Sequence, residues 1–145
     1  MKPGDHHTSV IVWLMNKDGE FLISRRAQGK RAAGMWEVTG GCTVSGETQL
    51  DAALREAKEE LGLSLNPEAG EIFTNFTSPH SGKDGWAYIT VWIFRQDFSL
   101  GDIVFQPEET DAARWASADE IREMISAGTF IEYDYIPDLL DYLKN

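Results

Sequence analysis

Residues 41–63 read GCTVSGETQLDAALREAKEELGL and carry the most informative pattern in the chain. Thr48 is typical of a helix N-cap with Asp51 three positions later, and Gly62 is typical of the residue that ends a helix. At 100° per residue, which is the α-helical period, the apolar side chains between these ends fall within a narrow arc. They are Leu50, Leu54, Ala57 and Leu61. The stretch therefore predicts a helix from Thr48 to Leu61 with one buried face.

A second arc of the same helix carries Glu56, Glu59 and Glu60, because positions i, i+3 and i+4 are neighbours on a helix surface. Like charges at this spacing destabilise a helix by roughly 0.2–0.5 kcal/mol per pair unless cations compensate them. Oxygen ligands without His or Cys favour Mg²⁺ or Mn²⁺. Glu47 is placed to add a fourth carboxylate, and Arg55 is placed to orient Glu59. A solvated acidic helix face is the alternative interpretation.

The segments around this helix alternate between strand and helix patterns. A β-branched run, an Asp-Gly turn and a second apolar run predict a hairpin near the start, and a capping box at Ser117 opens a later helix. Gly40–Gly46 is predicted as a glycine-rich loop. The predicted strands are Thr8–Met15, Glu20–Arg25, Trp36–Thr39, Gly70–Thr77, Trp86–Gln96 and Thr110–Ala116, and the predicted later helices cover 118–127 and Pro137–Lys144. This order predicts a single α/β domain over residues 1–145, with a mixed sheet.

Composition narrows the class of protein. Of 145 residues, 42% are apolar and 26% are charged, which is typical of one folded domain. The formal charge of −11 argues against DNA or RNA polymers as partners, since a polyanion is repelled. The single cysteine, Cys42, forms no intramolecular disulfide, and no apolar run approaches the roughly 20 residues of a membrane span. We therefore expect a cytoplasmic protein without a membrane partner.

The order of residues in 41–63 resembles the signature of the Nudix hydrolases. Gly41 is followed by Glu47 and then by the run REAKEELGL at 55–63. Ala57 is the one departure, because the family usually has a larger aliphatic residue there, and we expect a neighbouring side chain to fill the space. Segments before and after the signature also resemble Nudix elements. The resemblance implies an α/β/α sandwich and hydrolysis of a nucleoside diphosphate linked to another group, with Mg²⁺ as cofactor.

The same resemblance implies which residues hold the cation. Glu56 and Glu60 are the implied ligands, and Glu59 and Glu47 join them when more than one cation binds. Gly41, which opens the signature, is placed at the same site, where it meets both the cation and the substrate.

The general base is less well determined by the resemblance. Glu59 or Glu60 takes this role in the signature itself, with Arg55 orienting Glu59, but in several Nudix subfamilies the base comes from a distant loop. Glu108 and Glu109 are the loop candidates in this sequence. An ordinary acidic turn is the alternative interpretation for this pair.

Four basic residues lie shortly before the signature, namely Arg25, Arg26, Lys30 and Arg31. In an acidic protein such a cluster indicates a phosphate clamp, with solubilising loop charges as the alternative. If the strand continues, Arg25 and Arg26 point to opposite faces, so only one of them reaches the site.

Two weaker signals bear on the substrate. Trp86 and Tyr88 are candidates for contacting a ligand, whereas Trp13 and Trp92 lie in apolar strands and are predicted to be core residues. Pro79 lies sixteen residues after Leu63, a spacing associated with ADP-ribose pyrophosphatases, although a turn proline is the alternative. ADP-ribose or a nucleotide sugar is therefore ranked first and a (d)NTP second.

Two other classes of protein remain open. The chain also resembles the Nudix-related isopentenyl diphosphate isomerases, but their catalytic cysteine falls where this chain has Gly40, and Cys42 is expected to be an ordinary loop thiol. A Nudix module that senses a nucleotide without cleaving it is the other alternative, which the complete glutamate set disfavours. A homodimer is expected by analogy with the family only.

Overall fold

The computed structural model describes residues 7–29, 32–79, 86–104 and 110–143, and the side chains of His7, Pro79 and Trp86 lie outside what it describes. The predicted strands and helices are present, although the predicted strand Trp36–Thr39 is divided in two. The strands are β1 (His7–Met15), β2 (Phe21–Arg26), β3 (Trp36–Glu37), β4 (Thr39–Cys42), β5 (Gly70–Pro79), β6 (Trp86–Arg95) and β7 (Thr110–Ala116). The helices are α1 (Gln49–Leu61), α2 (Ala118–Ala127) and α3 (Ile136–Leu143), with short 3₁₀ turns η1 (Pro67–Ala69) and η2 (Leu100–Asp102).

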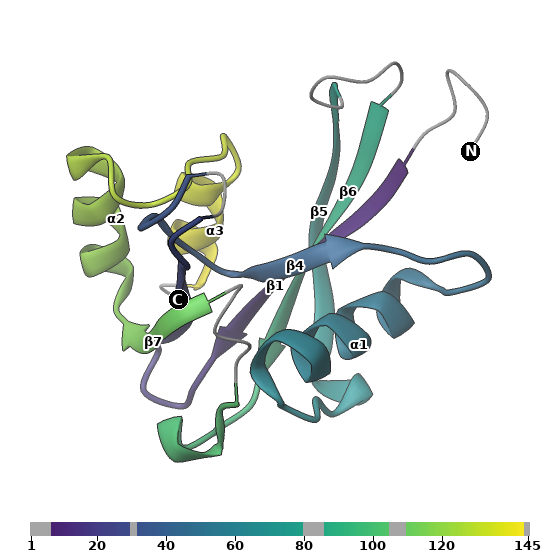
Figure 1. Ribbon diagram of the computed structural model, residues 1–145, viewed down its shortest axis with the longest axis horizontal. Coiled ribbons are helices and arrows are strands. Elements are labelled where there is room, and N and C mark those ends of the chain that lie inside the picture. Colours follow the sequence, from purple (N-terminus) through teal and green to yellow (C-terminus); the bar gives the residue numbers. More distant parts are fainter. Residues whose placement is uncertain (1–6, 30–31, 80–85, 105–109, 144–145) are drawn as a thin grey trace.

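β1 lies at the centre of a mixed sheet (Figure 1). It pairs in parallel with β6 along its whole length. Its other edge is divided, because β4 pairs with Ser9–Val12 and β2 pairs at Met15, both antiparallel. β3 and β7 pair with β2, and β5 pairs with β6, all antiparallel. The predicted mixed sheet is therefore confirmed.

Helices cover both faces of this sheet (Figure 1). α1 lies over a buried cluster that includes Val12 and Ala57, and α2 and α3 lie over a second cluster that includes Trp13 and Ile121. β1 contributes alternate residues to the two clusters, as a strand that is buried on both faces does. The predicted α/β/α sandwich is confirmed. Within the described ranges, no helix combines the length and the apolar character that a bilayer span requires.

α1 begins and ends where the sequence predicts. Thr48 accepts a hydrogen bond from the backbone N–H of Asp51 at 3.0 Å and completes a capping box. Gly62 has a left-handed φ of 70°, and its N–H donates to the carbonyls of Ala57 and Lys58. Ala57 is fully buried, so the small residue at this signature position packs in the core. These caps determine where along the sheet the glutamates of α1 lie.

The prediction of a glycine-rich loop at Gly40–Gly46 is wrong for the first residues of this range. Gly40 and Gly41 lie within β4, and so does Cys42, which is therefore a strand residue and not a loop thiol. The physical reason is steric, because a Cβ on Gly40 would lie 2.5 Å from the carbonyl oxygen of Val10. Without that Cβ, the backbone of β4 approaches β1 closely enough to pair with it.

This close approach makes Gly40 a stability determinant. We expect Gly40→Ala to lower the free energy of unfolding by about 2 kcal/mol, because the new methyl group overlaps backbone atoms that cannot rotate away. Urea unfolding measures the effect. Gly101→Ala is the matched control, since a Cβ there would have its nearest non-adjacent neighbour, Ser99 Oγ, 3.8 Å away. Equal stability for the two variants would contradict the prediction.

Candidate active site

β4 and α1 meet where two of the predicted carboxylates lie. The Thr39 hydroxyl donates a hydrogen bond to Glu60 Oε2 at 2.6 Å. A Cβ on Gly41 would lie 2.4 Å from Glu56 Oε1, so the glycine leaves space for that carboxylate. Because side chains alternate along a strand, residues 39 and 41 face the same side of β4. One face of this strand therefore receives both Glu56 and Glu60.

Arg55 contacts the other predicted carboxylates. Its Nε and Nη2 donate to Glu47 at 2.8 and 3.1 Å, and its Nη1 donates to Glu56 at 2.9 Å and to Glu59 at 3.1 Å. Its Nη2 also donates to the carbonyl of Cys42 at 2.8 Å. The predicted contact with Glu59 is present. The two-point contact with Glu47 fixes the residue that precedes α1 against the helix, and it raises the pKa of Arg55, which stays a cation.

The environment changes the proton affinity of three of these carboxyls. The hydrogen bond from Arg55 lowers the pKa of Glu47. Burial raises the pKa of Glu56, although the hydrogen bond and the charge of Arg55 oppose the change. Burial also raises the pKa of Glu60 to about 7, and the charges of Glu56 and Glu37 add to this effect. Glu56 and Glu60 therefore resist being ionised together, and a cation beside them would relieve the repulsion.

The chemistry of this donor set fits a divalent cation. In the part of the chain that the structure describes, no three His, Cys, Asp or Glu side chains are grouped as a metal-binding cluster. Arg55 lies among Glu47, Glu56 and Glu59 and supplies their counter-charge. One guanidinium shared among three carboxylates leaves the oxygen donors of Glu56 and Glu60 short of positive charge. Hard oxygen donors of this kind suit Mg²⁺ or Mn²⁺.

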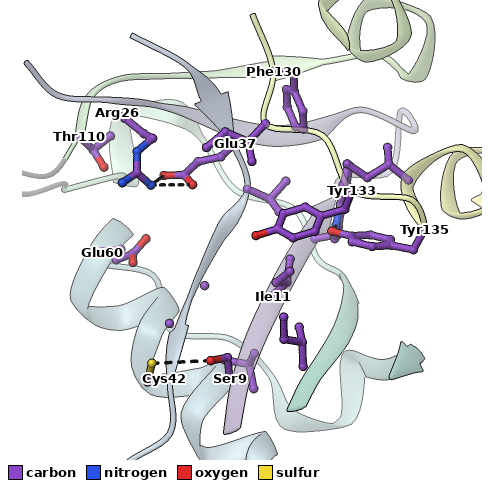
Figure 2. Close-up of a pocket in the computed structure, with 18 residues that line it drawn as sticks. Ser9, Ile11, Arg26, Glu37, Cys42, Glu60, Thr110, Phe130, Tyr133 and Tyr135 are labelled. Carbon is purple, nitrogen blue, oxygen red and sulfur yellow. Dashed lines mark hydrogen bonds and ion pairs between the residues drawn. The ribbon is translucent and has the colours of Figure 1, made fainter. Parts of the chain in front are cut away.

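A cavity of about 320 Å³ lies beside Glu60, which is part of its lining (Figure 2). Figure 2 shows Glu60 on one side of it, and the side chains of Tyr133 and Tyr135 on the other. Arg26 Nη1 donates to both carboxylate oxygens of Glu37 at 3.1 and 3.2 Å within its wall. The lining residues are Ser9, Val10, Ile11, Trp13, Arg26, Glu37, Val38, Gly40, Gly41, Cys42, Glu60, Ile89, Thr110, Phe130, Ile131, Tyr133, Tyr135 and Ile136. The volume is within the range of small-molecule pockets, about 300–1,000 Å³.

Comparison of the sequence with models of protein families shows which family has this arrangement. The model of the NUDIX domain matches residues 5–139, which is nearly the whole chain. The chain belongs to the Nudix family. Nudix hydrolases act on phosphoric anhydrides and generally use divalent cations such as Mg²⁺. The predicted family and enzyme class are confirmed.

Known proteins similar to this chain include hydrolases and an isomerase. An uncharacterized Nudix hydrolase of Listeria innocua is 30% identical, over 100% of this chain and 83% of the relative. An isopentenyl-diphosphate Delta-isomerase of Streptomyces coelicolor is 33% identical, over 88% of this chain and 66% of the relative. The crystal structure of a MutT protein from Methanosarcina mazei matches with a TM-score of 0.70 at 22% identity, over 99% and 96% of the two chains. This last likeness shows the Nudix fold.

The side chains of the two neighbouring arginines of β2 lie in different surroundings, as strand alternation predicts. Arg26 lines the cavity. Arg25 instead donates to Asp111 at 2.7 Å, and its guanidinium lies 5.7 Å from the ring centroid of Trp36. Arg26 is therefore the arginine that the structure brings to the candidate site.

Other predicted residues fall at or beyond the limits of the described ranges. Outside these ranges lie Lys30, Arg31, Glu108 and Glu109. Pro79 and Trp86 pair with each other where β5 ends and β6 begins, but their side chains are not described. Tyr88, the other aromatic candidate, is 37% exposed on β6. Trp13 and Trp92 are buried, as predicted.

Sequence reasoning missed most of the wall of the cavity. Glu37, which lines the cavity, precedes the Nudix signature by four positions and does not belong to it. Thr39, which contacts Glu60 but does not line the cavity, precedes the signature by two and was also missed. Tyr133 and Tyr135 lie in the segment between α2 and α3, where the pattern predicts neither strand nor helix. Their alternation with acidic residues in IEYDYIP, 131–137, is the one signal that could have drawn attention to them.

Proposed function

We propose that this Nudix protein is a Mg²⁺-dependent hydrolase of a nucleoside diphosphate linked to a further group, with ADP-ribose or a nucleotide sugar favoured. The observation that carries the proposal is the cavity that Glu60, one member of the Glu56–Glu60 pair, lines. A diphosphate at the carboxylates would place its attached group in this cavity. Mn²⁺ is the alternative cation, because the same oxygen donors accept it.

The carboxylates have distinct roles in this proposal. Glu56 and Glu60 hold the cation, and Glu47 and Glu59, which Arg55 orients, complete the site when more than one cation binds. A cation held there would neutralise phosphate oxygens and lower the pKa of bound water. Gly41 contributes by leaving room for the Glu56 carboxylate. These residues thereby lower the charge repulsion that an attacking water meets at a diphosphate.

The proton of the attacking water needs an acceptor within hydrogen-bond reach. We propose Glu59 or Glu60 for this role, with Glu108 and Glu109 as the alternative source. Glu59 is the more exposed of the signature pair, and Arg55 holds one of its oxygens at 3.1 Å. Separate Glu→Gln substitutions at the four positions would identify the base as the residue whose loss lowers kcat while Mn²⁺ affinity is kept, because loss of a cation ligand lowers both.

The charge balance of the cavity favours an uncharged group attached to the diphosphate. Among the described residues that line it, the charged side chains are Arg26, Glu37 and Glu60. Carboxylates accept hydrogen bonds from hydroxyl and amino groups but repel further phosphates. A sugar or an amino-bearing base therefore fits this wall better than the tail of a triphosphate does. Arg26 is the cationic side chain among the described cavity residues and can donate to a phosphate oxygen. Pro79 and Trp86, where β5 ends and β6 begins, remain proposed contacts.

Isomerase activity is the second candidate, because a relative carries that name. The position that holds the isomerase cysteine is Gly40 here, and a Cβ on Gly40 would overlap the Val10 carbonyl oxygen. A cysteine therefore does not fit at residue 40 of this backbone. Cys42 is exposed and lines the cavity, where Ser9 Oγ donates to its sulfur at 3.6 Å. Isomerase activity is therefore tested as an alternative, with Cys42 as the cysteine that lines the cavity.

One assay separates these candidates. ADP-ribose, nucleotide sugars, NADH, dinucleoside polyphosphates, (d)NTPs and isopentenyl diphosphate are each incubated with the protein and Mg²⁺, and the products are separated chromatographically. AMP and ribose phosphate from ADP-ribose would support the proposal. Pyrophosphate from a (d)NTP, or dimethylallyl diphosphate from isopentenyl diphosphate, would replace it with that activity. Nucleotide binding without any product would indicate a sensor.

The pKa of Glu60 gives the cation site a pH dependence. Burial raises this pKa from 4.5 to about 7, so the metal-free folded state holds a proton that the unfolded chain has released. That contribution to the free energy of unfolding is complete below pH 4.5 and is lost as the pH rises through about 7. We expect Mg²⁺ to raise the melting temperature more at about pH 8 than at about pH 5, because the cation replaces the proton.

Thermal unfolding with chelator and with Mg²⁺ across this range measures the effect. Glu60→Gln is the control, since it has no proton to release at this position, and its response to Mg²⁺ should be small at every pH. A Mg²⁺ response of wild type that does not change with pH would contradict the prediction.

Three further properties belong to the proposal by family analogy. We propose that residues 1–145 act as one Nudix domain, that the protein works on its small-molecule substrate in the cytoplasm, and that two chains form a homodimer. Light scattering coupled to size exclusion tests the dimer directly.

A further inference from the structure

The hydrogen bond between Thr39 and Glu60 lies outside the Nudix signature, because Thr39 precedes Gly41 by two positions. Thr39 is 4% exposed, and its hydroxyl donates to Glu60 Oε2 at 2.6 Å. The same residue pairs with Val12 of β1, so the central strand of the sheet fixes its backbone. A hydroxyl held in this way is a rigid donor aimed at one carboxylate oxygen.

The spacing of the two elements explains why Thr39 and Gly41 act together. Two residues along a strand advance by about 6.6 Å, and four residues along a helix advance by about 6.0 Å. The spacing of residues 39 and 41 along β4 is therefore close to the spacing of Glu60 and Glu56 along α1. Thr39 lies against Glu60 and Gly41 against Glu56, because the two elements run in opposite directions. Gly41 makes space for one carboxylate, and Thr39 holds the other.

We propose that Thr39 is a positioning residue, whose hydroxyl holds the Glu60 carboxylate in the orientation in which Glu56 and Glu60 together take up the divalent cation. This inference rests on the proposed function, because it assigns the carboxylate pair to a cation. Partners that orient a ligand in this way are typically worth about 10–100-fold in metal affinity or activity.

Thr39→Val removes the donor and keeps the shape, and Thr39→Ser keeps the donor. The chain also offers a matched control, because Thr90 is fully buried on β6 and donates to Asn75 Oδ1 at 2.8 Å, outside the cavity. Thr90→Val loses a comparable buried hydrogen bond. Three quantities are measured for each variant: Mn²⁺ affinity of the metal-free protein by electron paramagnetic resonance, kcat and KM on the substrate found in the panel, and stability to urea.

We expect Thr39→Val to weaken Mn²⁺ binding about tenfold and to lower kcat by a similar factor with little change in KM. Thr39→Ser should stay within about twofold of wild type, because the donor is preserved. Thr90→Val should lose stability without losing Mn²⁺ affinity. If Thr39→Val does not fold, Thr39→Ala and Thr39→Ser replace it, because they differ only in the hydroxyl.

Two failures are distinguishable in this experiment. Wild-type protein that binds no Mn²⁺ and turns over nothing in the panel would overturn the proposed function, and the role of Thr39 with it. Wild-type protein that binds Mn²⁺, together with a Thr39→Val variant of equal affinity and kcat, would overturn the positioning role alone. A loss in Thr39→Val that Thr39→Ser does not restore would also overturn it, since the hydroxyl would not be the cause.

Discussion

Glu60→Gln is expected to lower kcat by about a hundredfold or more while the protein stays folded. Glutamine has nearly the same shape as glutamate but is a much weaker cation ligand, and it cannot accept a proton as the carboxylate does. The loss of several kcal/mol of transition-state stabilisation corresponds to a factor of this size. Folding should not suffer, because burial already opposes the charged form of Glu60 and raises its pKa. Steady-state kinetics at saturating Mg²⁺, with urea unfolding alongside, measures both effects.

Glu68→Gln is the matched control for this variant. Glu68 is an exposed residue of η1, and the same loss of charge there should leave kcat unchanged. Wild-type rates in Glu60→Gln would remove Glu60 from the reaction and would refute the assignment of the carboxylate pair.

Gly41→Ala is expected to lower kcat by about tenfold to a hundredfold, for a different reason. The new Cβ would lie 2.4 Å from Glu56 Oε1, and the carboxylate would have to move. A displacement of about 1 Å at a reacting group costs a factor of this order. The loss of stability should be only about 1 kcal/mol, because the end of a flexible side chain moves and the backbone does not. The activity and the urea unfolding curve of the same variant are compared.

Gly40→Ala provides the contrast within the same strand. Its Cβ would meet the backbone of β1, so we expect lost stability with less direct effect on the carboxylates. If Gly41→Ala lost stability as strongly as Gly40→Ala and kept wild-type kcat, the role assigned to Gly41 would be wrong.

Much of the fold could be predicted from local patterns. The caps of α1 at Thr48 and Gly62, the strand alternation and the turn residues each depend on a few neighbouring side chains, and the structure confirms the elements that they predict. The extent of β4 could not be predicted in this way. Two consecutive glycines are typical of a loop, and only the contact with β1, some thirty residues earlier, makes Gly40 and Gly41 a strand.

The candidate site also combines features that local patterns predict with features that depend on tertiary contacts. The proximity of Glu56, Glu59 and Glu60 follows from helix geometry, and the structure brings Arg55 to Glu59 as the i, i+4 spacing predicts. The contact of Glu60 with Thr39 depends on tertiary packing, which no local period reveals. The cavity wall at 130–136 is still harder to predict from local sequence patterns, because an irregular segment that follows α2 provides it.

The cavity combines parts with separate origins in the chain, and this has an evolutionary consequence. The carboxylates belong to α1, whereas much of the wall that would meet the attached group belongs to the segment Phe130–Ile136. We expect substitutions in that segment to change which molecule is accepted while α1 keeps the proposed chemistry. Two lineages of this protein would then differ in substrate specificity while sharing one reaction. Their sequence differences should concentrate between α2 and α3.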